Sequence, residues 1–305
     1  MISDATVSGE NNIMKTVLLI GQNGQVTTYL QKTLVGSELY ELVVADREKL
    51  DLLKLDQISD SLGALKPDVI INPAAYTAVD LAEEEQSAAF CINRDAVAKI
   101  ANYCAEATVP LIHFSTDYVF SGDASTPYLE SDATLPNGVY GQSKLEGEQA
   151  ILESGAAAVI LRTAWVYSNH GKNFYKTMLM LSESRTELNV VNDQIGAPTY
   201  AGSIAQATKE LLDVIVAQGE LRPEQQGVFH FSCQGQTSWC DFAKALFAEN
   251  NITHMDVQGI PTEQYPTPAK RPAFSVLNGQ KLQATFGISL PDWKDALRDC
   301  VNESA

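Results

Sequence analysis

The stretch KTVLLIGQNGQV at residues 15–26 decides the fold. Residues 15–20 form a short apolar run that ends at Gly21, and after a polar turn apolar residues recur at helical spacing over residues 26–35. A strand, a glycine turn and a helix in this order bring free backbone amides and the positive end of a helix to a point where a dinucleotide pyrophosphate can bind. Gly21 and Gly24 alone leave such binding open, because glycines are also common turn formers.

Outward from this stretch, the same unit recurs along the chain. Further apolar runs lie at residues 42–45, 69–71, 111–114 and 158–161, with helical patterns between them, for example at 88–105 and 144–153. Buried strands that alternate with helices predict an α/β fold with a Rossmann-type, doubly wound parallel sheet. Residues 188–191 are expected to add a sixth strand, and a helix over residues 201–216 to cover one face of the sheet.

Beyond residue 221, prolines and turns become frequent and the regular alternation stops. We therefore expect a smaller α/β C-terminal domain that binds the substrate. The expected division is 14–167 plus 188–219 for the dinucleotide-binding Rossmann domain, and 168–187 plus 220–305 for the substrate-binding domain. Residues 1–13 are an additional leader to which the sequence assigns no role.

Composition narrows the class of protein. The 305 residues carry a net charge of −17, which disfavours nucleic acid and anionic membranes as partners. The five cysteines show no CxxC spacing, so we expect reduced thiols and no metal site. No apolar run approaches the roughly 20 residues of a membrane span, and residues 1–13 do not look like a signal peptide. A soluble, cytoplasmic protein is expected.

Three side chains are predicted to be catalytic. Tyr140 and Lys144 are four residues apart and share one face of a predicted helix, where the lysine ammonium is expected to lower the pKa of the tyrosine. Thr116 adds a hydroxyl at the carboxyl end of the fourth strand, where α/β folds bind ligands. It can hydrogen-bond a substrate carbonyl beside Tyr140 and stabilise a developing alkoxide.

Asp46 and Arg47 follow the second strand. An acidic side chain at this position can accept a hydrogen bond from a ribose 2′-OH, whereas an arginine can pair with a 2′-phosphate. The two residues therefore leave the choice between NADH and NADPH open, and a solvated charge pair at a strand end is the alternative interpretation.

In the order of these motifs the chain resembles the extended short-chain dehydrogenase/reductase family, and within it the dTDP-4-dehydrorhamnose reductases. The resemblance begins near Met14 and covers nearly all of the rest of the chain. Besides the glycine turn, its motifs are NPAAYTAVDLAE at 72–83, HFSTDYVFSG at 113–122, VYGQSKLEGE at 139–148, LRTAWVYS at 161–168, NFYKTML at 173–179, NDQIGAPT at 192–199 and YPTPAKRP at 265–272.

The resemblance implies a reaction and a set of site residues. The reaction is reduction of dTDP-6-deoxy-L-lyxo-4-hexulose at C4 by hydride from NADPH or NADH, with NADPH favoured, to give dTDP-L-rhamnose. The implied cofactor-binding residues are Gly21, Asn23, Gly24, Gln25, Val26, Asp46, Arg47, Asp51, Leu52, Ala74, Ala75, Tyr76, Ser115, Tyr140 and Lys144. The implied nucleotide-sugar residues are Thr77, Val79, Thr116, Tyr118, Trp165, Gln194, Gly196, Pro198 and Arg271.

Within this set the resemblance also assigns roles. Tyr140 would protonate the C4 oxygen, Lys144 would hold the cofactor ribose, and Thr116 would orient the ketone. A guanidinium matches phosphate oxygens in bidentate geometry, which makes Arg271 the main candidate for the diphosphate. From its place inside a helix pattern, Asn93 is a candidate to support the catalytic helix, and an ordinary asparagine on the helix surface is the alternative interpretation.

The chain departs from the family pattern at two positions. Thr27 replaces the third glycine of the turn, which would loosen the contact of helix and strand. Tyr29 stands where some members carry a glutamate that helps to bind magnesium at a dimer contact. Tyrosine cannot replace that ligand, so no such magnesium site is expected, and a homodimer is left open.

Two rival interpretations differ in class. A nucleotide-sugar epimerase or 4,6-dehydratase shares the fold, but a dehydratase carries Asp-Glu after the catalytic threonine, and here Asp117 and Tyr118 follow Thr116. A non-catalytic, dinucleotide-binding regulatory subunit also shares the fold. The complete set of Thr116, Tyr140 and Lys144 argues against it without refuting it.

Overall fold

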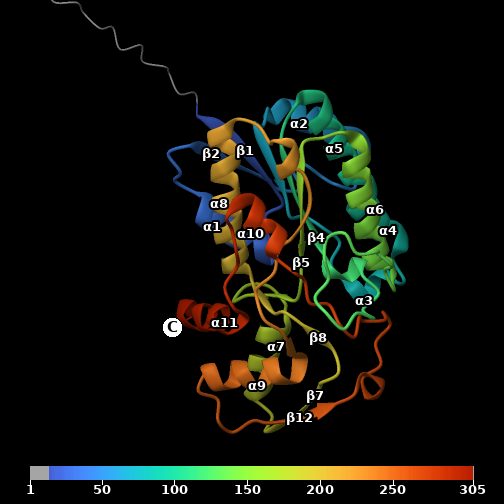
Figure 1. The fold of residues 1–305 in the computed structure, drawn as a ribbon, viewed down its shortest axis with the longest axis vertical. Helices are drawn as coiled ribbons and strands as arrows, with labels where there is room; N and C mark the ends of the chain where they lie inside the picture. Colours follow the sequence, from blue (N-terminus) through green and yellow to red (C-terminus); the bar gives the residue numbers. More distant parts are fainter. Residues whose placement is uncertain (1–13, 305) are drawn as a thin grey trace, which may run out of the picture.

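The computed structural model describes residues 14–304, and a six-stranded parallel sheet forms its centre (Figure 1). In spatial order the strands are β10 (Gly227–His230), β5 (Ala158–Thr163), β4 (Leu111–Thr116), β3 (Val69–Asn72), β1 (Lys15–Ile20) and β2 (Tyr40–Ala45). Successive residues of β1 enter opposite cores: Val17 and Leu19 face one, Leu18 and Ile20 the other. Both faces are therefore apolar, and the predicted parallel α/β sheet is confirmed.

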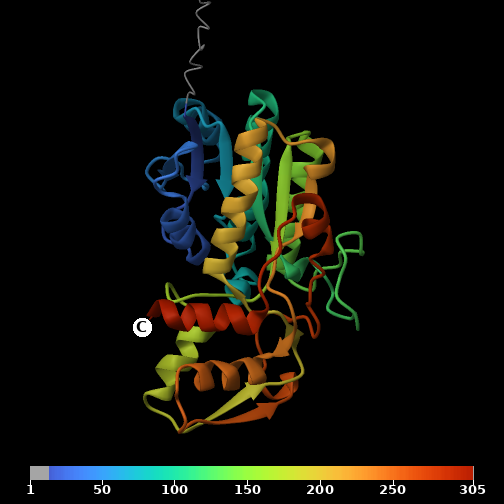
Figure 2. The same cartoon turned by 60° about the vertical axis from the view of Figure 1, so that its left-hand side comes forward.

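Helices cover both faces of the sheet (Figures 1 and 2). One layer consists of α1 (Gln25–Leu34) and α8 (Ala201–Gln218), whose buried side chains share a core with Val17 and Leu19. The other contains α2 (Ile58–Leu65), α5 (Ala96–Ala107) and α6 (Val139–Ser154). This is the doubly wound arrangement, and the helix predicted over residues 201–216 is confirmed as α8.

Two helices near the site differ from their predicted extents. The pattern at 88–105 is divided into α4 (Gln86–Phe90), the π-helical segment η2 (Cys91–Asp95) and α5. Helix α6 extends the pattern at 144–153 back to Val139, so Tyr140 lies in its first turn, on the helix where it was predicted to share a face with Lys144. The short helix α3 (Val79–Ala82) and the single turn η3 (Asp117–Val119) complete the surroundings of the site.

The prediction that residues 188–191 join the central sheet is wrong. They belong to β7 (Glu187–Val191), which pairs in parallel with β12 (Asp256–Ile260) in the C-terminal lobe. Side chains of β7 alternate between exposed and buried because α9 (Trp239–Glu249) covers only one face of this pair. The sixth strand of the central sheet is β10, which comes later in the chain and pairs with β5.

The C-terminal lobe packs against the sheet domain through one continuous apolar core. Phe242 and Leu297 belong to the same cluster as Leu30 and Ile204 of the sheet-covering helices. The lobe and its connections contain α7 (Phe174–Ser182), α10 (Gln280–Phe286), α11 (Trp293–Ser304), the paired strands β6 (Val166–Tyr167) and β9 (Thr199–Tyr200), the paired strands β8 (Ile195–Gly196) and β11 (Thr237–Ser238), and the turns η4 (Pro223–Gln225) and η5 (Thr262–Gln264); η1 (Leu55–Gln57) precedes α2.

Two further expectations concern the whole chain. All five cysteines are free thiols, as predicted. Among residues 14–304, no helix combines the length and the apolar character that crossing a bilayer requires. The leader at residues 1–13 lies outside the described residues.

Candidate active site

The glycine turn leads from β1 into α1. Gly21 has a φ of +95°, which favours glycine, and its amide donates to the Ala45 carbonyl at 2.8 Å. Gly24 precedes α1 and has no side chain with which to cap it, so the first amides of the helix lie uncapped at the turn. The Gln31 carboxamide donates to the Gln22 carbonyl at 2.8 Å and fixes the turn. Such a turn suits a pyrophosphate.

A cleft of about 490 Å³ lies beside this turn, at the carboxyl ends of β1, β2 and β3. Among its lining residues are the predicted cofactor residues Gly21, Asn23, Asp46, Arg47, Asp51, Leu52, Ala74 and Ala75. Glu48, Leu50, Leu53 and Ile92 also line it and were missed because no motif marks their positions, and Gln22 was missed although it lies within the glycine turn. Gly24, Gln25 and Val26 continue from the turn into α1.

Gln25 and Asp46 are both held by neighbouring chain. Gln25 Oε1 accepts hydrogen bonds from Ser168 Oγ at 2.9 Å and from Asn173 Nδ2 at 2.8 Å, so the side chain is engaged with the loop before α7. If Gln25 binds a cofactor, it therefore does so through its backbone amide. Asp46 Oδ1 accepts from the amides of the two residues at 48 and 49, which fixes its carboxylate at the mouth of the cleft.

Thr116 and Tyr140 bring two hydroxyls together. Thr116 ends β4, and its hydroxyl is hydrogen-bonded to Tyr140 in the first turn of α6. Thr116 Oγ1 also lies 3.0 Å from Oδ1 of the buried Asp117. The Tyr118 ring packs edge-on against the Tyr140 ring, with 5.5 Å between centroids. A predicted substrate residue thus stands beside two predicted catalytic ones.

Lys144 lies behind this pair, and only 2% of its surface is exposed. Its Nζ donates to the Phe114 carbonyl at 2.6 Å and lies 3.3 Å from His113 Nε2. Burial lowers the pKa of Lys144 to about 8, against the charge of Glu148, which raises it. Burial also raises the pKa of Tyr140 above its ordinary value, against the hydrogen bond with Thr116. The expectation that Lys144 lowers the tyrosine pKa is therefore wrong for this arrangement.

Two glycines bring α6 against neighbouring backbone. A Cβ added at Gly141 would stand 2.2 Å from the Tyr118 carbonyl oxygen, and one at Gly147 would stand 2.1 Å from the Asn93 carbonyl oxygen. Neither backbone could approach a larger residue so closely. The catalytic helix is therefore placed by main-chain contacts at two points.

Asn93 connects the loop after β3 to the catalytic helix. It is fully buried in η2 and donates from Nδ2 to Ser143 Oγ at 3.0 Å, while Ser143 Oγ donates to the Tyr140 carbonyl at 2.8 Å. The same carboxamide accepts from the Tyr76 amide at 2.8 Å and donates to the Tyr76 carbonyl at 3.1 Å. Asn93 thus contacts the catalytic helix as expected, and it also fixes the backbone of a predicted cofactor residue.

A buried ion pair lies one turn beyond Lys144 on α6. Arg162 Nη2 and Glu148 Oε2 are 2.6 Å apart, and the two side chains are 4% and 2% exposed. Ser115 donates its hydroxyl to the same carboxylate. The side chain of this predicted cofactor residue is therefore engaged with Glu148. The pair could not be predicted from the sequence, because Glu148 and Arg162 lie on different elements, a helix and a strand, and share no motif.

Arg271 lies beside Tyr118. Its Nη1 donates to the Tyr118 hydroxyl at 3.1 Å, and its Nη2 pairs with Asp80 Oδ2 at 2.8 Å. Asp80, on α3, also accepts from the Ala269 amide at 3.2 Å. The predicted diphosphate ligand is thus held against Tyr118 by the carboxylate of Asp80, which no sequence motif had marked as a site residue. Thr77, just before α3, is exposed, and Val79 is half-buried.

Trp165 and Gly196 are brought into contact. Trp165 has a φ of +46°, which is costly for a bulky residue, and its indole stacks on Trp239 with 3.5 Å between ring centroids. A Cβ at Gly196 would stand 2.4 Å from the Trp165 indole, so only glycine permits this approach. Gln194 and Pro198, predicted from the same loop, are both buried.

Comparison with known proteins places the chain in one family. Residues 14–305 match the family model described as RmlD substrate binding domain. A dTDP-4-dehydrorhamnose reductase of Burkholderia thailandensis is 41% identical over 294 residues, which cover 94% of this chain and 98% of the relative. One of Sinorhizobium fredii is 43% identical over 284 residues, or 92% of this chain and 95% of the relative. The chain belongs to the dTDP-4-dehydrorhamnose reductase family.

Solved structures of this family have the same fold. The Bacillus anthracis reductase in complex with NADP superposes with a TM-score of 0.88 at 33% identity, covering 95% of this chain and all of that one (100%). The Clostridium acetobutylicum reductase gives a TM-score of 0.87 at 35% identity, with 95% and 99% coverage. The resemblance drawn from the sequence motifs is confirmed.

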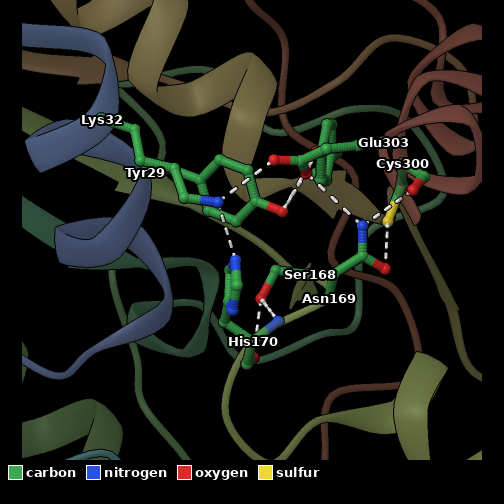
Figure 3. Close-up of polar contacts among 8 residues, drawn as sticks. Tyr29, Lys32, Ser168, Asn169, His170, Cys300 and Glu303 are labelled. Atoms are coloured by element: carbon green, nitrogen blue, oxygen red, sulfur yellow. Dashed lines mark hydrogen bonds and ion pairs between the residues drawn. The ribbon is translucent and has the colours of Figure 1, made fainter. Parts of the chain in front are cut away.

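In this dTDP-4-dehydrorhamnose reductase family member, polar side chains join the C-terminal helix α11 to α1 (Figure 3). We call Tyr29, Lys32, Tyr200 and Glu303 the C-terminal cluster. Both tyrosine hydroxyls donate to the Glu303 carboxylate, and Lys32 Nζ lies 3.3 Å from it. Tyr29 stands where some family members carry a magnesium-binding glutamate, and here its hydroxyl donates to the Glu303 carboxylate. Within residues 14–304 no group of three His, Cys, Asp or Glu side chains could hold a metal ion.

Replacing Glu303 by alanine is expected to lower the melting temperature by a few degrees near neutral pH and by less in acid. Burial opposes ionisation of Glu303, but hydrogen bonds from Tyr200 and Tyr29, with Lys32, outweigh it and lower its pKa from 4.5 to about 2. A carboxyl with a lowered pKa stabilises the fold above its unfolded pKa and loses this contribution as the pH falls through 4.5 toward 2. Because the side chain is 37% exposed, we expect about 1 kcal/mol.

Thermal unfolding of wild type and Glu303→Ala, followed by circular dichroism at about pH 7 and about pH 3, measures this contribution. The difference in melting temperature should shrink at the lower pH. An equal difference in melting temperature at both pH values would show that the charge of the Glu303 carboxylate does not hold α11 in place.

Proposed function

We propose that this protein reduces dTDP-6-deoxy-L-lyxo-4-hexulose at C4 with hydride from NADPH or NADH and forms dTDP-L-rhamnose. The observation that carries the proposal is the hydrogen-bonded pair of Thr116 and Tyr140, with Lys144 behind it, at the carboxyl end of β4. Two hydroxyls at one point suit a carbonyl oxygen that becomes an alkoxide. Relatives about 40% identical over almost their full length carry the name of this activity.

The cofactor would lie along the glycine turn and the adjacent cleft. The residues present suit a dinucleotide: the start of α1 is uncapped, Gly21 leaves the turn open, and the cleft has a small-residue wall at Ala74 and Ala75. When bound, the nicotinamide supplies the hydride. A solved relative in complex with NADP supports this assignment, and NADPH is favoured over NADH.

The chain's own groups would handle the proton and the orientation of the ketone. Tyr140 would donate its proton to the C4 oxygen, and Thr116 would hold that oxygen from a second direction. The raised pKa of Tyr140 keeps its proton in place at neutral pH until the alkoxide develops, because burial disfavours the phenolate. Lys144 would hold the ribose from its place in the second turn of α6.

The C-terminal lobe would hold the nucleotide sugar. Arg271 and Tyr118 stand in hydrogen-bond contact and suit the diphosphate, and Trp165 on Gly196 offers an aromatic face. A division into a dinucleotide-binding and a nucleotide-sugar-binding domain follows, with β10 assigned to the first and β7 to the second. The cytoplasmic location and a homodimer stay predictions.

The reaction itself is the test. Purified protein is mixed with NADPH or NADH and enzymatically prepared dTDP-6-deoxy-L-lyxo-4-hexulose, and cofactor oxidation is followed together with the sugar product. Stoichiometric formation of dTDP-L-rhamnose supports the proposal. Binding of cofactor without turnover of the keto-sugar would contradict it and favour a non-catalytic dinucleotide-binding subunit.

Replacing Arg47 by alanine is expected to raise the Kd for NADPH by about tenfold and to leave the Kd for NADH nearly unchanged. Arg47 is exposed at the cleft, where its guanidinium can reach a 2′-phosphate that NADH lacks. Quenching of protein fluorescence gives both constants. Arg185→Ala, which removes an exposed arginine of the C-terminal lobe, is the matched control. Equal weakening of both cofactors would exclude recognition of the 2′-phosphate by Arg47.

A further inference from the structure

A chain of buried polar side chains runs from β3 through β4 to the catalytic helix. Asn72 and His113 are register partners on adjacent strands, and both are fully buried. Asn72 Nδ2 lies 3.2 Å from His113 Nδ1, and His113 Nε2 lies 3.3 Å from Lys144 Nζ. Neither Asn72 nor His113 belongs to the predicted site, although both lie within its sequence motifs.

The backbone fixes which way the Asn72 carboxamide points. The Ala74 amide donates to Asn72 Oδ1 at 3.2 Å, so the other end of the carboxamide, Nδ2, faces the imidazole. A carboxamide nitrogen can only donate, and His113 Nδ1 must therefore accept. A neutral imidazole that accepts at Nδ1 carries its proton on Nε2. Burial lowers the pKa of His113 well below its ordinary value, which keeps the ring neutral.

The Nε2 proton then points at Lys144. An ammonium has three donors and no acceptor, so a charged Lys144 would oppose this N–H with a donor of its own. A neutral amine has one lone pair, which accepts from His113 Nε2 while the amine donates to the Phe114 carbonyl at 2.6 Å. Every contact of Lys144 Nζ is then satisfied. The hydrogen-bond pattern thus fits the amine and conflicts with the ammonium.

We propose that Asn72 and His113 form a buried hydrogen-bond relay that presents an N–H to Lys144 and favours the neutral amine of this lysine. His113 is a positioning residue, because it acts on the reaction through Lys144. Protonation of Lys144 turns an attractive contact into a donor–donor repulsion. The charged lysine therefore leaves His113 and turns its donors toward the side of α6 on which Tyr140 lies.

One neighbouring group, the carboxylate of Glu148, favours the charged form of Lys144 instead. Glu148 lies one turn further along α6, but its carboxylate is neutralised by Arg162 of β5 and occupied by Ser115 of β4. Burial acts in the same direction as His113 and lowers the pKa of Lys144. Lys144 therefore stands near the balance of its two forms, where one hydrogen bond decides the outcome.

The tautomer of His113 is the direct test, and it needs no turnover. In the full-length protein labelled with 15N-histidine, long-range proton–nitrogen spectra distinguish the Nε2–H tautomer from the Nδ1–H tautomer and from imidazolium. The four histidines of the chain allow assignment by single substitutions. We expect His113 to be neutral, with the proton on Nε2, across about pH 5 to 9. An Nδ1–H tautomer, or an imidazolium near pH 6, would overturn the proposal.

The role in the reaction rests on the proposed function and is tested by His113→Gln. A glutamine can turn its carbonyl oxygen toward Lys144 and accept from the ammonium, which raises the lysine pKa. Because the proposed role of Lys144 calls for its ammonium form, which has three donors, the loss of kcat/KM at high pH should move upward by about one pH unit. His254→Gln, an exposed histidine of the C-terminal lobe, should leave the profile unchanged.

These results separate the two proposals. An Nε2–H tautomer together with no keto-sugar turnover would contradict the proposed function and leave the relay intact. Turnover in the wild type with an unshifted profile in His113→Gln would overturn the relay and leave the reductase intact. The tautomer is read in the wild-type protein, so a variant that fails to fold does not remove the test.

Discussion

Replacing Tyr140 by phenylalanine is expected to lower kcat for the keto-sugar by about a hundredfold to ten-thousandfold, with little change in the Kd for NADPH. The substitution removes the hydroxyl that is bonded to Thr116 and keeps the ring that packs against Tyr118. Helix α6 therefore keeps its place while the C4 oxygen loses its proton donor. Single-turnover and steady-state oxidation of NADPH measure the effect.

A matched control is Tyr103→Phe. This tyrosine lies on α5, and its hydroxyl donates to the Leu62 carbonyl at 3.3 Å. It should retain the wild-type rate, because its hydroxyl contacts the backbone of α2 and no residue of the proposed site. If Tyr140→Phe also kept its rate, another group would have to protonate the sugar, and the assignment of the acid would be wrong.

Replacing Arg162 by methionine is expected to cost about 3–5 kcal/mol of the free energy of unfolding. Both members of the pair with Glu148 are almost fully buried, and the substitution leaves the carboxylate without its countercharge. Ser115 would then be the remaining partner of that carboxylate. Urea denaturation followed by circular dichroism measures the loss.

The double variant Arg162→Met with Glu148→Leu separates charge from packing. Two apolar side chains leave no buried charge behind, so we expect this variant to recover most of the lost stability. A double variant as unstable as the single one would mean that the pair contributes through its shape. A single variant that loses under about 1 kcal/mol would show that water reaches Glu148.

The parts of this protein that could be predicted from its sequence are those encoded locally. The glycine turn, the apolar runs of β1 and β4, and the spacing of Tyr140 and Lys144 each occupy a short segment with one dominant period. The sixth strand could not be found in this way. Strand β10 has four residues, and Gly227 and His230 leave only two apolar ones, whereas residues 188–191 carry three apolar side chains and serve a separate two-stranded sheet.

Contacts between distant segments explain the rest. Asp80 and Arg271 are 191 positions apart in the chain, and Glu148 and Arg162 meet only because β5 returns beside α6. The direction of the Tyr140 pKa was misjudged for the same reason. Sequence spacing brought Lys144 near Tyr140, but burial, which no spacing reveals, has the largest effect on the Tyr140 pKa.

The close approach of α6 to its neighbours at Gly141 and Gly147 bears on how this fold can acquire new substrates. Because main chain meets main chain at both points, the catalytic hydroxyls keep their spacing whatever happens to side chains elsewhere. The loops that carry Trp165 and Arg271 take no part in the backbone contacts at Gly141 and Gly147. We expect sugar preference and catalytic competence to be separable traits in descendants of this chain: mutations in the lobe can explore new sugars while the chemistry is inherited unchanged.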